Sequence, residues 1–382
     1  ECGTWKLVPR SQVPKEKKII GSTWAFDLKR NKENKIDRHK SRLCAQGFSQ
    51  VAGFDYFRTY SNTVRYDTLR LVLAISARKG YHLSGADIKT AYLNSTIDDD
   101  LTIYMRQPKG FEKTGPKGEE MVCLLQKAIY GLKQSGARWE ARLVQYLLGA
   151  GFERCDVDPC LYLLRRNGET LLLVVYVDDL IMATSTIALR QEVVSDLTKN
   201  FKLKDTGDLD WVFGTSIVQS KSLRRVSLHQ TIYIDNLVDT YLGDKDRSGK
   251  ERVTPCNDEI LVTDPLKDGE TIHPEYRTIV GKLGWLSLIS RPDIAYAYNM
   301  LAKFASAGTP RHFRLAQAVV KYLKRTRKYE IRYGEEERSL HIEHVITGTK
   351  SRCDFTWPDA AMFYTDATYG GERPMGGYTG YY

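Results

Sequence analysis

The clearest pattern of apolar and polar positions lies in residues 171–182. Two apolar runs, 171–175 and 180–182, are separated by a short segment that ends in two adjacent acids, Asp178 and Asp179. Apolar runs of this length on either side of a tight turn are typical of paired strands, so the acids are predicted at the tip of a hairpin. A solvated turn explains such a pair. A cation site also explains it, because burying charge without a partner is unfavourable.

The same criteria divide the chain into an N-terminal part rich in strands and a C-terminal part rich in helices. Apolar residues at strand-like spacing predict strands, and apolar residues three and four positions apart predict helices. Residues 243–273 are polar and rich in turn formers, which indicates a loop or linker. Strands are expected at 19–30, 42–48, 161–164, 171–182, 211–219 and 225–229. Helices are expected at 68–79, 139–150, 188–201, 230–241, 274–289, 293–306 and 310–326.

A third acid, Asp87, follows small residues in an expected strand, and the aromatic residue Tyr92 comes five positions later. Two-metal nucleotidyl transfer needs carboxylates that come from separate strands and converge on one point. Asp87 on one strand, with Asp178 and Asp179 on a hairpin tip, supplies such a set. This second segment favours the cation site over the solvated turn.

Several short motifs, each weak alone, follow one another in a specific order and spacing. They are Gly3-Thr4-Trp5-Lys6-Leu7-Val8-Pro9, the run from His39 to Gln50, Asp87-Ile88-Lys89-Thr90-Ala91-Tyr92-Leu93-Asn94, Ile129-Tyr130-Gly131-Leu132-Lys133-Gln134, Tyr176-Val177-Asp178-Asp179, Arg291-Pro292-Asp293-Ile294 and Tyr322-Leu323-Lys324. With these motifs the chain resembles the reverse transcriptase of copia-like LTR retrotransposons. It departs from the family at Ser95 and Gly136, where Gly and Pro are usual.

The resemblance implies an α+β fold of the right-hand polymerase type, with fingers, palm and thumb. It places fingers and palm at 1–229, the thumb at 230–310 and a connection at 311–360. Residues 361–382 resemble the start of an RNase H domain, in which Asp366 falls at the first metal-binding carboxylate. Such a site needs further acids from later elements, so we expect no RNase H activity; an ordinary Asp near a turn is the alternative.

By the same resemblance, the reaction is the extension of a primer on an RNA or DNA template. Asp87 and Asp178 are expected to hold two Mg²⁺ ions, for which Mn²⁺ can substitute. Asp179 supports the site, and the backbone carbonyl of Ile88 is a further ligand. Magnesium prefers oxygen ligands and retains water and phosphate in its shell, which suits a site that substrate completes.

The resemblance also implies residues that bind the incoming deoxynucleoside triphosphate. Tyr92 matches an aromatic ring that excludes the ribose 2′-hydroxyl, with a tyrosine of the core as the alternative. Tyr130 and Gly131 are expected to line the nucleotide and template side. Cations are expected to grip the triphosphate through charge-assisted bonds, and a solvated surface is the alternative for each of them. These cations are Lys35, Lys40 and Arg42.

The net charge of the chain is +10, and a basic surface favours polyanions through counterion release. A basic run near the end of the last expected helix includes Lys321, Lys324 and Arg325. These side chains are candidates to contact the backbone of a nucleic-acid duplex, although a charge run also arises on a solvated helix face. The expected macromolecular partners are an RNA template, a DNA primer, and the integrase and capsid of the same polyprotein.

The cysteine and hydropathy patterns indicate the cellular environment in which the protein is expected. The seven cysteines form no CxxC pair, so we expect reduced thiols in an intracellular protein. No apolar stretch reaches about 18 residues without a charge, so no membrane span is expected. The chain begins at Glu1, which suggests a piece of a longer polyprotein. The resemblance implies a cytoplasmic virus-like particle with a later nuclear stage.

Two other functions stay open at this point. The first is a decayed or repurposed copy that binds nucleic acid without synthesis, although the intact Asp87, Asp178 and Asp179 argue against simple catalytic loss. The second is another palm-type nucleotidyl enzyme, such as a nucleotide cyclase, which the expected thumb helices disfavour. No GxxxxGK[ST] loop is present, so ATP-driven chemistry has no support.

Overall fold

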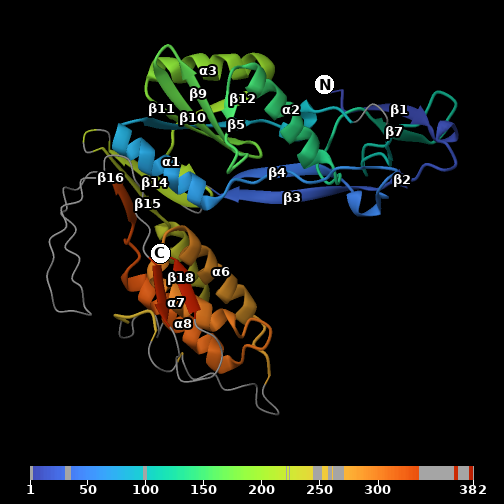
Figure 1. The fold of residues 1–382 in the computed structure, drawn as a ribbon. Coiled ribbons are helices and arrows are strands. Elements are labelled where there is room, and N and C mark those ends of the chain that lie inside the picture. Colours follow the sequence, from blue (N-terminus) through green and yellow to red (C-terminus); the bar gives the residue numbers. More distant parts are fainter. Residues whose placement is uncertain are drawn as a thin grey trace, which may run out of the picture. The chain divides into compact units, whose positions relative to one another are not determined.

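The computed structural model divides the chain into two units, drawn as ribbons in Figure 1. The first unit contains Glu1–Phe213 and Ile217–Val226, and the second contains Gly214–Ser216 and Ser227–Tyr382. The structure describes residues 3–30, 36–97, 101–220, 222, 224–243, 252–256, 260, 271–334, 365–368 and 378–381.

The first unit is built on a six-stranded sheet with the order β12-β5-β11-β10-β9-β8. The predicted hairpin lies within it: β10 and β11 pair antiparallel, and Tyr176 lies opposite Asp179 at the tip. On its other side, β11 pairs antiparallel with β5, and Asp179 lies opposite Asp87. This register brings the predicted acids to one end of neighbouring strands. The strands are β5 (His82–Ile88), β8 (Glu153–Arg154), β9 (Leu161–Arg166), β10 (Glu169–Tyr176), β11 (Asp179–Thr184) and β12 (Leu203–Asp208).

Helices cover both faces of this sheet (Figure 1). Leu180 and Met182 of β11 belong to one hydrophobic cluster with α2 and α3. The alternate residues Ile181 and Ala183 are also buried, and α1 packs against this strand. Because both faces of β11 are buried, a shift of its register would expose or displace apolar side chains on either side. The helices are α1 (Tyr66–Lys79), α2 (Ser135–Gly149) and α3 (Ile187–Asn200).

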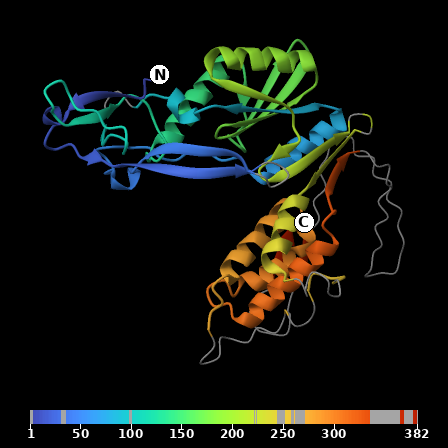
Figure 2. The ribbon, with the colours of Figure 1, turned by 180° about the vertical axis from the view of Figure 1, so that it is seen from behind.

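The first unit also contains a second sheet, of order β1-β7-β6-β2, and a two-stranded ribbon. In the ribbon, which Figure 2 shows from behind as long blue strands, β3 and β4 pair antiparallel. The strand predicted at 42–48 is wrong at its end, because β4 stops at Ala45 and a 3-10 turn at Gly47–Ser49 follows. The strands are β1 (Trp5–Pro9), β2 (Ile19–Ile20), β3 (Ser22–Arg30), β4 (Ile36–Ala45), β6 (Tyr104–Met105) and β7 (Met121–Leu125).

The first turn of α1 is stabilised by a carboxylate from a distant part of the chain. Asp158 accepts hydrogen bonds from the Arg65 amide at 3.1 Å, the Thr68 hydroxyl at 2.5 Å and the Cys160 amide at 2.9 Å. Arg65 is the N-cap of α1 and its own side chain makes no capping bond, so Asp158 takes that role. Burial alone would raise the pKa of Asp158, but these hydrogen bonds outweigh it and hold the pKa below its ordinary value.

Four helices of the second unit share one hydrophobic core. Next to this core, the nearly fully buried Arg291 donates hydrogen bonds to both carboxylate oxygens of Asp293 and to the carbonyl and hydroxyl of Thr326. The boundary predicted at residue 310 falls between helices that pack together, since α8 belongs to the same core as the other three. The helices are α4 (Thr231–Tyr241), α6 (Tyr276–Ile289), α7 (Ala295–Ala302) and α8 (Pro310–Arg325).

The remaining strands form a sheet of order β13-β14-β15-β16 and the pair β17-β18. In the part of the chain that the structure describes, no helix has the length and apolar character needed to cross a membrane. The strands are β13 (Trp211–Val212), β14 (Thr215–Ser220), β15 (Arg225–His229), β16 (Ile331–Gly334), β17 (Thr365–Thr368) and β18 (Tyr378–Tyr381).

We expect Asp158 to make the stability of the first unit depend on pH. Its pKa is lower in the folded chain than in the unfolded chain, so its stabilisation is present at neutral pH and is lost as the pH falls below the ordinary Asp value of about 3.9. Asp158→Asn should therefore lower the free energy of unfolding by about 1–3 kcal/mol at pH 7, and by less at pH 3. Urea denaturation at both pH values measures this.

Asp156→Asn is the matched control, because Asp156 is exposed and only two positions away. It should leave the urea midpoint unchanged at pH 7. A difference between Asp158→Asn and the parent chain that stays constant from pH 7 to pH 3 would contradict the capping role.

Candidate active site

The backbone of the hairpin tip fixes the positions of Asp178 and Asp179. Val177, the first of the two tip residues, has a φ of 56°, in the left-handed region that a β-branched residue rarely adopts. The Asp178 carbonyl accepts a hydrogen bond at 2.8 Å from the amide of Ile88, the residue that follows Asp87 on β5. The tip is thereby tied to the strand that carries the third acid.

Burial and like charge disfavour the ionised forms of Asp178 and Asp179. Desolvation raises the pKa of Asp178 and the charge of Asp87 raises it further, while Lys40 and Arg42 act in the opposite direction. Desolvation also raises the pKa of Asp179 to about 6, and the charges of Asp178 and Asp87 contribute in the same direction. A cation bound nearby would lower the pKa of such acids, because a positive charge favours their ionised form.

Cations and aromatic rings from two other segments lie near these acids. Lys40 and Arg42 of β4 are close enough to lower the pKa of Asp178. The Arg42 guanidinium lies over the Tyr130 ring, 5.8 Å from its centroid, and this ring packs edge to face on Tyr92 with centroids 4.8 Å apart. Burial and the charge of Asp178 raise the pKa of both tyrosines, so both hydroxyls are neutral at pH 7. The structure therefore brings these four side chains and the acids into one site.

Glycine residues let the Tyr130 segment approach the end of β4. The Tyr130 carbonyl accepts a hydrogen bond from the Ala45 amide at 2.8 Å. A Cβ on Gly131, whose φ is 90°, would lie 2.1 Å from the Ala45 carbonyl oxygen. A Cβ on Gly47 would lie 2.0 Å from the carbonyl oxygen of Gly131. The contact between these two segments therefore depends on the absence of side chains at both positions.

A buried set of amide side chains fixes the segment after Gly131. The Gln50 side chain donates to the Gln134 side chain at 3.1 Å, and Gln134 donates to the Asp55 carbonyl at 2.9 Å. Gln50 also accepts a hydrogen bond from the Lys133 amide at 2.8 Å. Sequence reasoning placed both glutamines within motifs and assigned neither a role, because their partners are far away in the sequence.

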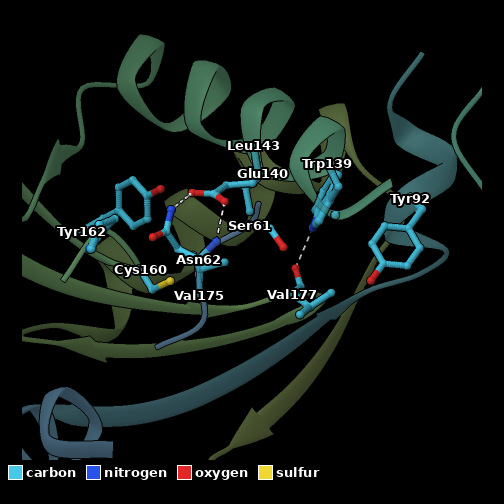
Figure 3. A pocket seen from close by; sticks show the side chains of 12 residues that line it. Ser61, Asn62, Tyr92, Trp139, Glu140, Leu143, Cys160, Tyr162, Val175 and Val177 are labelled. Atoms are coloured by element: carbon cyan, nitrogen blue, oxygen red, sulfur yellow. Dashed lines mark hydrogen bonds between the residues drawn. The ribbon is translucent and has the colours of Figure 1, made fainter. Parts of the chain in front are cut away.

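A cavity of about 40 Å³ lies between α2 and the hairpin (Figure 3). Trp139 lines it and donates a hydrogen bond from Nε1 to the Val177 carbonyl at 2.7 Å. Glu140 lines it as well, and accepts hydrogen bonds from Asn62 and Arg154. This volume suffices for a water molecule and not for a nucleotide. The acids at the strand ends, rather than this cavity, mark the candidate active site.

A comparison with models of protein families places the chain among known proteins. The family model described as reverse transcriptase (RNA-dependent DNA polymerase) matches residues 2–246. The chain belongs to the reverse transcriptase family. The resemblance predicted from the motifs is confirmed, and with it the assignment to a class of nucleotidyltransferases.

Relatives of this reverse transcriptase chain include Pol polyproteins of plant transposons. The chain is 30% identical over 331 residues to the retrovirus-related Pol polyprotein from transposon TNT 1-94 of Nicotiana tabacum, a match that covers 85% of the chain and 24% of the relative. It is 33% identical over 331 residues to that from transposon RE1 of Arabidopsis thaliana, covering 86% and 22%. The chain therefore spans about a quarter of the length of these relatives.

Among solved structures, the foamy viral protease-reverse transcriptase in complex with double-stranded DNA is similar to this chain at a TM-score of 0.39. The two are 14% identical, and the match covers 75% of this chain and 42% of the viral chain.

Reverse transcriptases use divalent metal ions, and the acids described above fit such a group. Within the described ranges, no group of three or more His, Cys, Asp or Glu side chains is arranged as a metal centre. Magnesium at phosphate-transfer sites, however, is held by one or two carboxylates and completed by substrate phosphates and water. Asp87 and Asp178 supply that number of carboxylates. The raised pKa of Asp178 is consistent with a place for a cation.

Five other predicted residues are not among the described side chains of the first unit. Lys35 lies outside the described residues. Lys321, Lys324 and Arg325 belong to α8 of the second unit, where the first two are half-buried and the third is exposed. Asp366 lies in β17, of which the structure describes the backbone.

We expect Gly131→Ala to separate the Tyr130 segment from β4. The added methyl group would meet the Ala45 carbonyl oxygen at 2.1 Å, whereas Gly151→Ala, at the same φ of 90°, would meet only Leu164 Cδ1 at 3.9 Å. Both substitutions carry the strain of the same positive φ, so an additional loss at Gly131, about 1–3 kcal/mol, reports the clash. Urea denaturation of the two variants measures the difference, and equal losses would contradict the required close approach.

Proposed function

We propose that the chain is an RNA-directed DNA polymerase that extends a primer on an RNA or DNA template by two-metal nucleotidyl transfer, in the replication of a retrotransposon. The observation that carries this proposal is the meeting of Asp87, Asp178 and Asp179 at the ends of paired strands. Membership of the reverse transcriptase family and the transposon relatives support it.

The acids would hold the metal ions that the reaction needs. In this reaction the primer 3′-hydroxyl attacks the α-phosphate of a deoxynucleoside triphosphate, and pyrophosphate leaves. Bound Mg²⁺, or Mn²⁺ in its place, favours ionisation of the attacking hydroxyl and neutralises the leaving oxygens. Asp87 and Asp178 would provide the carboxylate ligands and Ile88 a backbone carbonyl. Asp179 would add negative charge beside them.

Lys40 and Arg42 would bind the triphosphate. Both side chains lie on β4, close enough to Asp178 to lower its pKa. Arg42 can donate two parallel hydrogen bonds to phosphate oxygens, and Lys40 supplies a point charge. The Tyr130 ring below the Arg42 guanidinium limits the positions that this side chain can take.

Tyr92 would select deoxynucleotides by occupying the space of a ribose 2′-hydroxyl. Its ring is supported from the side by Tyr130 and is near enough to Asp178 for that charge to raise its pKa. The contact with Tyr130 closes one direction in which the Tyr92 ring could move aside.

Partners of the proposed enzyme are a template-primer duplex, deoxynucleoside triphosphates and other products of the same polyprotein, such as integrase and capsid. Lys321, Lys324 and Arg325 are proposed to contact the duplex backbone. Such contacts carry no sequence information, which suits copying of any template. The proposed setting is a cytoplasmic virus-like particle with a nuclear stage.

Nucleic-acid binding without synthesis is the second candidate function. The basic character of the chain, with a net charge of +10, serves this function equally well.

Primer extension on poly(rA)/oligo(dT) with Mg²⁺ or Mn²⁺ tests the proposal. We expect the parent chain to extend the primer and Asp178→Asn to lose at least about a hundredfold of the rate, because several kcal/mol of transition-state stabilisation depend on the ions. Binding of template-primer, measured by fluorescence anisotropy, should change little.

Asp196→Asn, at a half-exposed position of α3 where Asp196 pairs with Lys199, removes the same charge away from the site and should extend normally. Template-primer binding without extension by the parent chain would favour the second candidate function. Equal losses of binding and extension in Asp178→Asn would contradict the metal-binding role.

We expect Tyr92→Val to admit ribonucleotides. Removal of the ring opens the space of the 2′-hydroxyl, and relief of one steric clash of about 1–3 kcal/mol should reduce the preference for deoxynucleotides by about tenfold or more. Single-nucleotide incorporation of dTTP against UTP measures the preference. Tyr92→Phe keeps the ring and should keep the preference; an unchanged preference in Tyr92→Val would contradict the assignment.

A further inference from the structure

The hairpin tip has a backbone conformation that its sequence does not favour. Among the two tip residues, Val177 has a positive φ and Asp178 does not, which is the pattern of a type II′ turn. Glycine is preferred at the first position of this turn because it has no Cβ. A β-branched residue there is strained by about 1–3 kcal/mol, so the surrounding structure must hold it in place.

Trp139 makes the contact that can hold this turn. Its indole N–H donates to the Val177 carbonyl at 2.7 Å, as the dashed line in Figure 3 shows. The Trp139 side chain is 2% exposed and packs edge to face on Phe201, with ring centroids 5.5 Å apart. An indole N–H is only a donor, and it is fixed here by a buried ring on α2, so it defines one position for the carbonyl.

Both carbonyls of the tip are held by groups outside the hairpin. Trp139 binds that of Val177, and the Ile88 amide of β5 binds that of Asp178 at 2.8 Å. The peptide plane between Val177 and Asp178 is therefore set from α2, and the next one is set from β5. The orientation of the Asp178 carboxylate depends on both planes.

Packing alone does not fix the tip on the side of α2. The cavity of about 40 Å³ between α2 and the hairpin is lined by both Trp139 and Val177. A side chain next to open space can shift without a clash, so the hydrogen bond restrains the tip where van der Waals contact does not.

We propose that Trp139 is a positioning residue that holds the strained Val177 peptide through its indole N–H and so directs Asp178 toward the reacting groups. This inference rests on the proposed polymerase function for its consequence in catalysis. The positioning itself is a property of the chain and can be observed without activity. Val177→Gly supplies the critical comparison, because glycine adopts the positive φ without help.

The experiment compares Trp139→Phe, Val177→Gly and the double variant with the parent chain. Phenylalanine keeps an aromatic ring against Phe201 and removes the donor. We expect Trp139→Phe to reduce the single-turnover rate of nucleotide addition by about tenfold, with little change in template-primer affinity. In the Val177→Gly background the same substitution should reduce the rate by no more than about threefold, because the turn no longer needs the bond.

Stability provides the readout that separates positioning from a structural role. Trp139→Phe should shift the urea midpoint by a similar amount in both backgrounds, since the Val177 carbonyl loses its donor in each. Recovery of rate without recovery of stability supports positioning. An equal loss of rate in both backgrounds, or no loss in either, overturns the proposal.

Hydrogen exchange of residues 171–184, measured by mass spectrometry, gives a second readout that needs no catalysis. Trp139→Phe should accelerate exchange at the tip by about tenfold, and the double variant should exchange more slowly than Trp139→Phe. Unchanged exchange in Trp139→Phe overturns the proposal. If no variant or parent chain synthesises DNA, the polymerase function fails while this exchange pattern still decides the role of Trp139.

Tyr146→Phe is the matched control. Tyr146 lies on the same helix and packs edge to face on the same Phe201 ring, with centroids 5.1 Å apart. Its substitution should change neither the rate of nucleotide addition nor exchange at the hairpin tip. An effect equal to that of Trp139→Phe would show that disturbance of α2, rather than the indole bond, controls the site, and would overturn the proposal.

Discussion

The burial of like-charged carboxylates at the ends of paired strands is the constraint on which the site depends. The register of β11 with β5 sets Asp179 opposite Asp87, and desolvation together with like charge raises the pKa of Asp178 and Asp179. Lys40 and other cations offset part of this unfavourable energy. The unfavourable energy that these cations do not offset favours the binding of a further cation. A feature that is unfavourable for folding therefore suits the proposed chemistry, as is common where function and stability compete.

The surrounding structure keeps this crowded point rigid through contacts of different kinds. Burial of β11 on both faces opposes a change of register. Gly131 brings the Tyr130 segment to within hydrogen-bonding distance of β4. Trp139 reaches the tip from α2. Each contact joins the hairpin or its neighbours to a different segment, so the geometry of the acids reflects the folded first unit as a whole.

Residues with a role that depends on local sequence could be recognised before the structure was known. Asp87 and Tyr92 lie in one short motif, and the apolar runs around Asp178 predicted the hairpin that β10 and β11 form. Asp158 could not be assigned a role in this way, because it caps a helix whose N-cap lies 93 positions away in the sequence. Gly136 departs from the usual Pro, and a Cβ there would lie 2.7 Å from the Ser61 hydroxyl, a relation that only the folded chain contains.

The sequence by itself determined the family, the main helices and the hairpin that carries Asp178 and Asp179, because apolar periodicity and contiguous motifs are local properties. Tertiary structure alone decided which segments meet. It placed Lys40 and Arg42 near Asp178, and it joined α8 to the core of the other helices in the second unit. It also paired Trp139 with the strained turn. These relations arise from burial and close packing between distant residues, and such contacts leave no periodic signal in the chain.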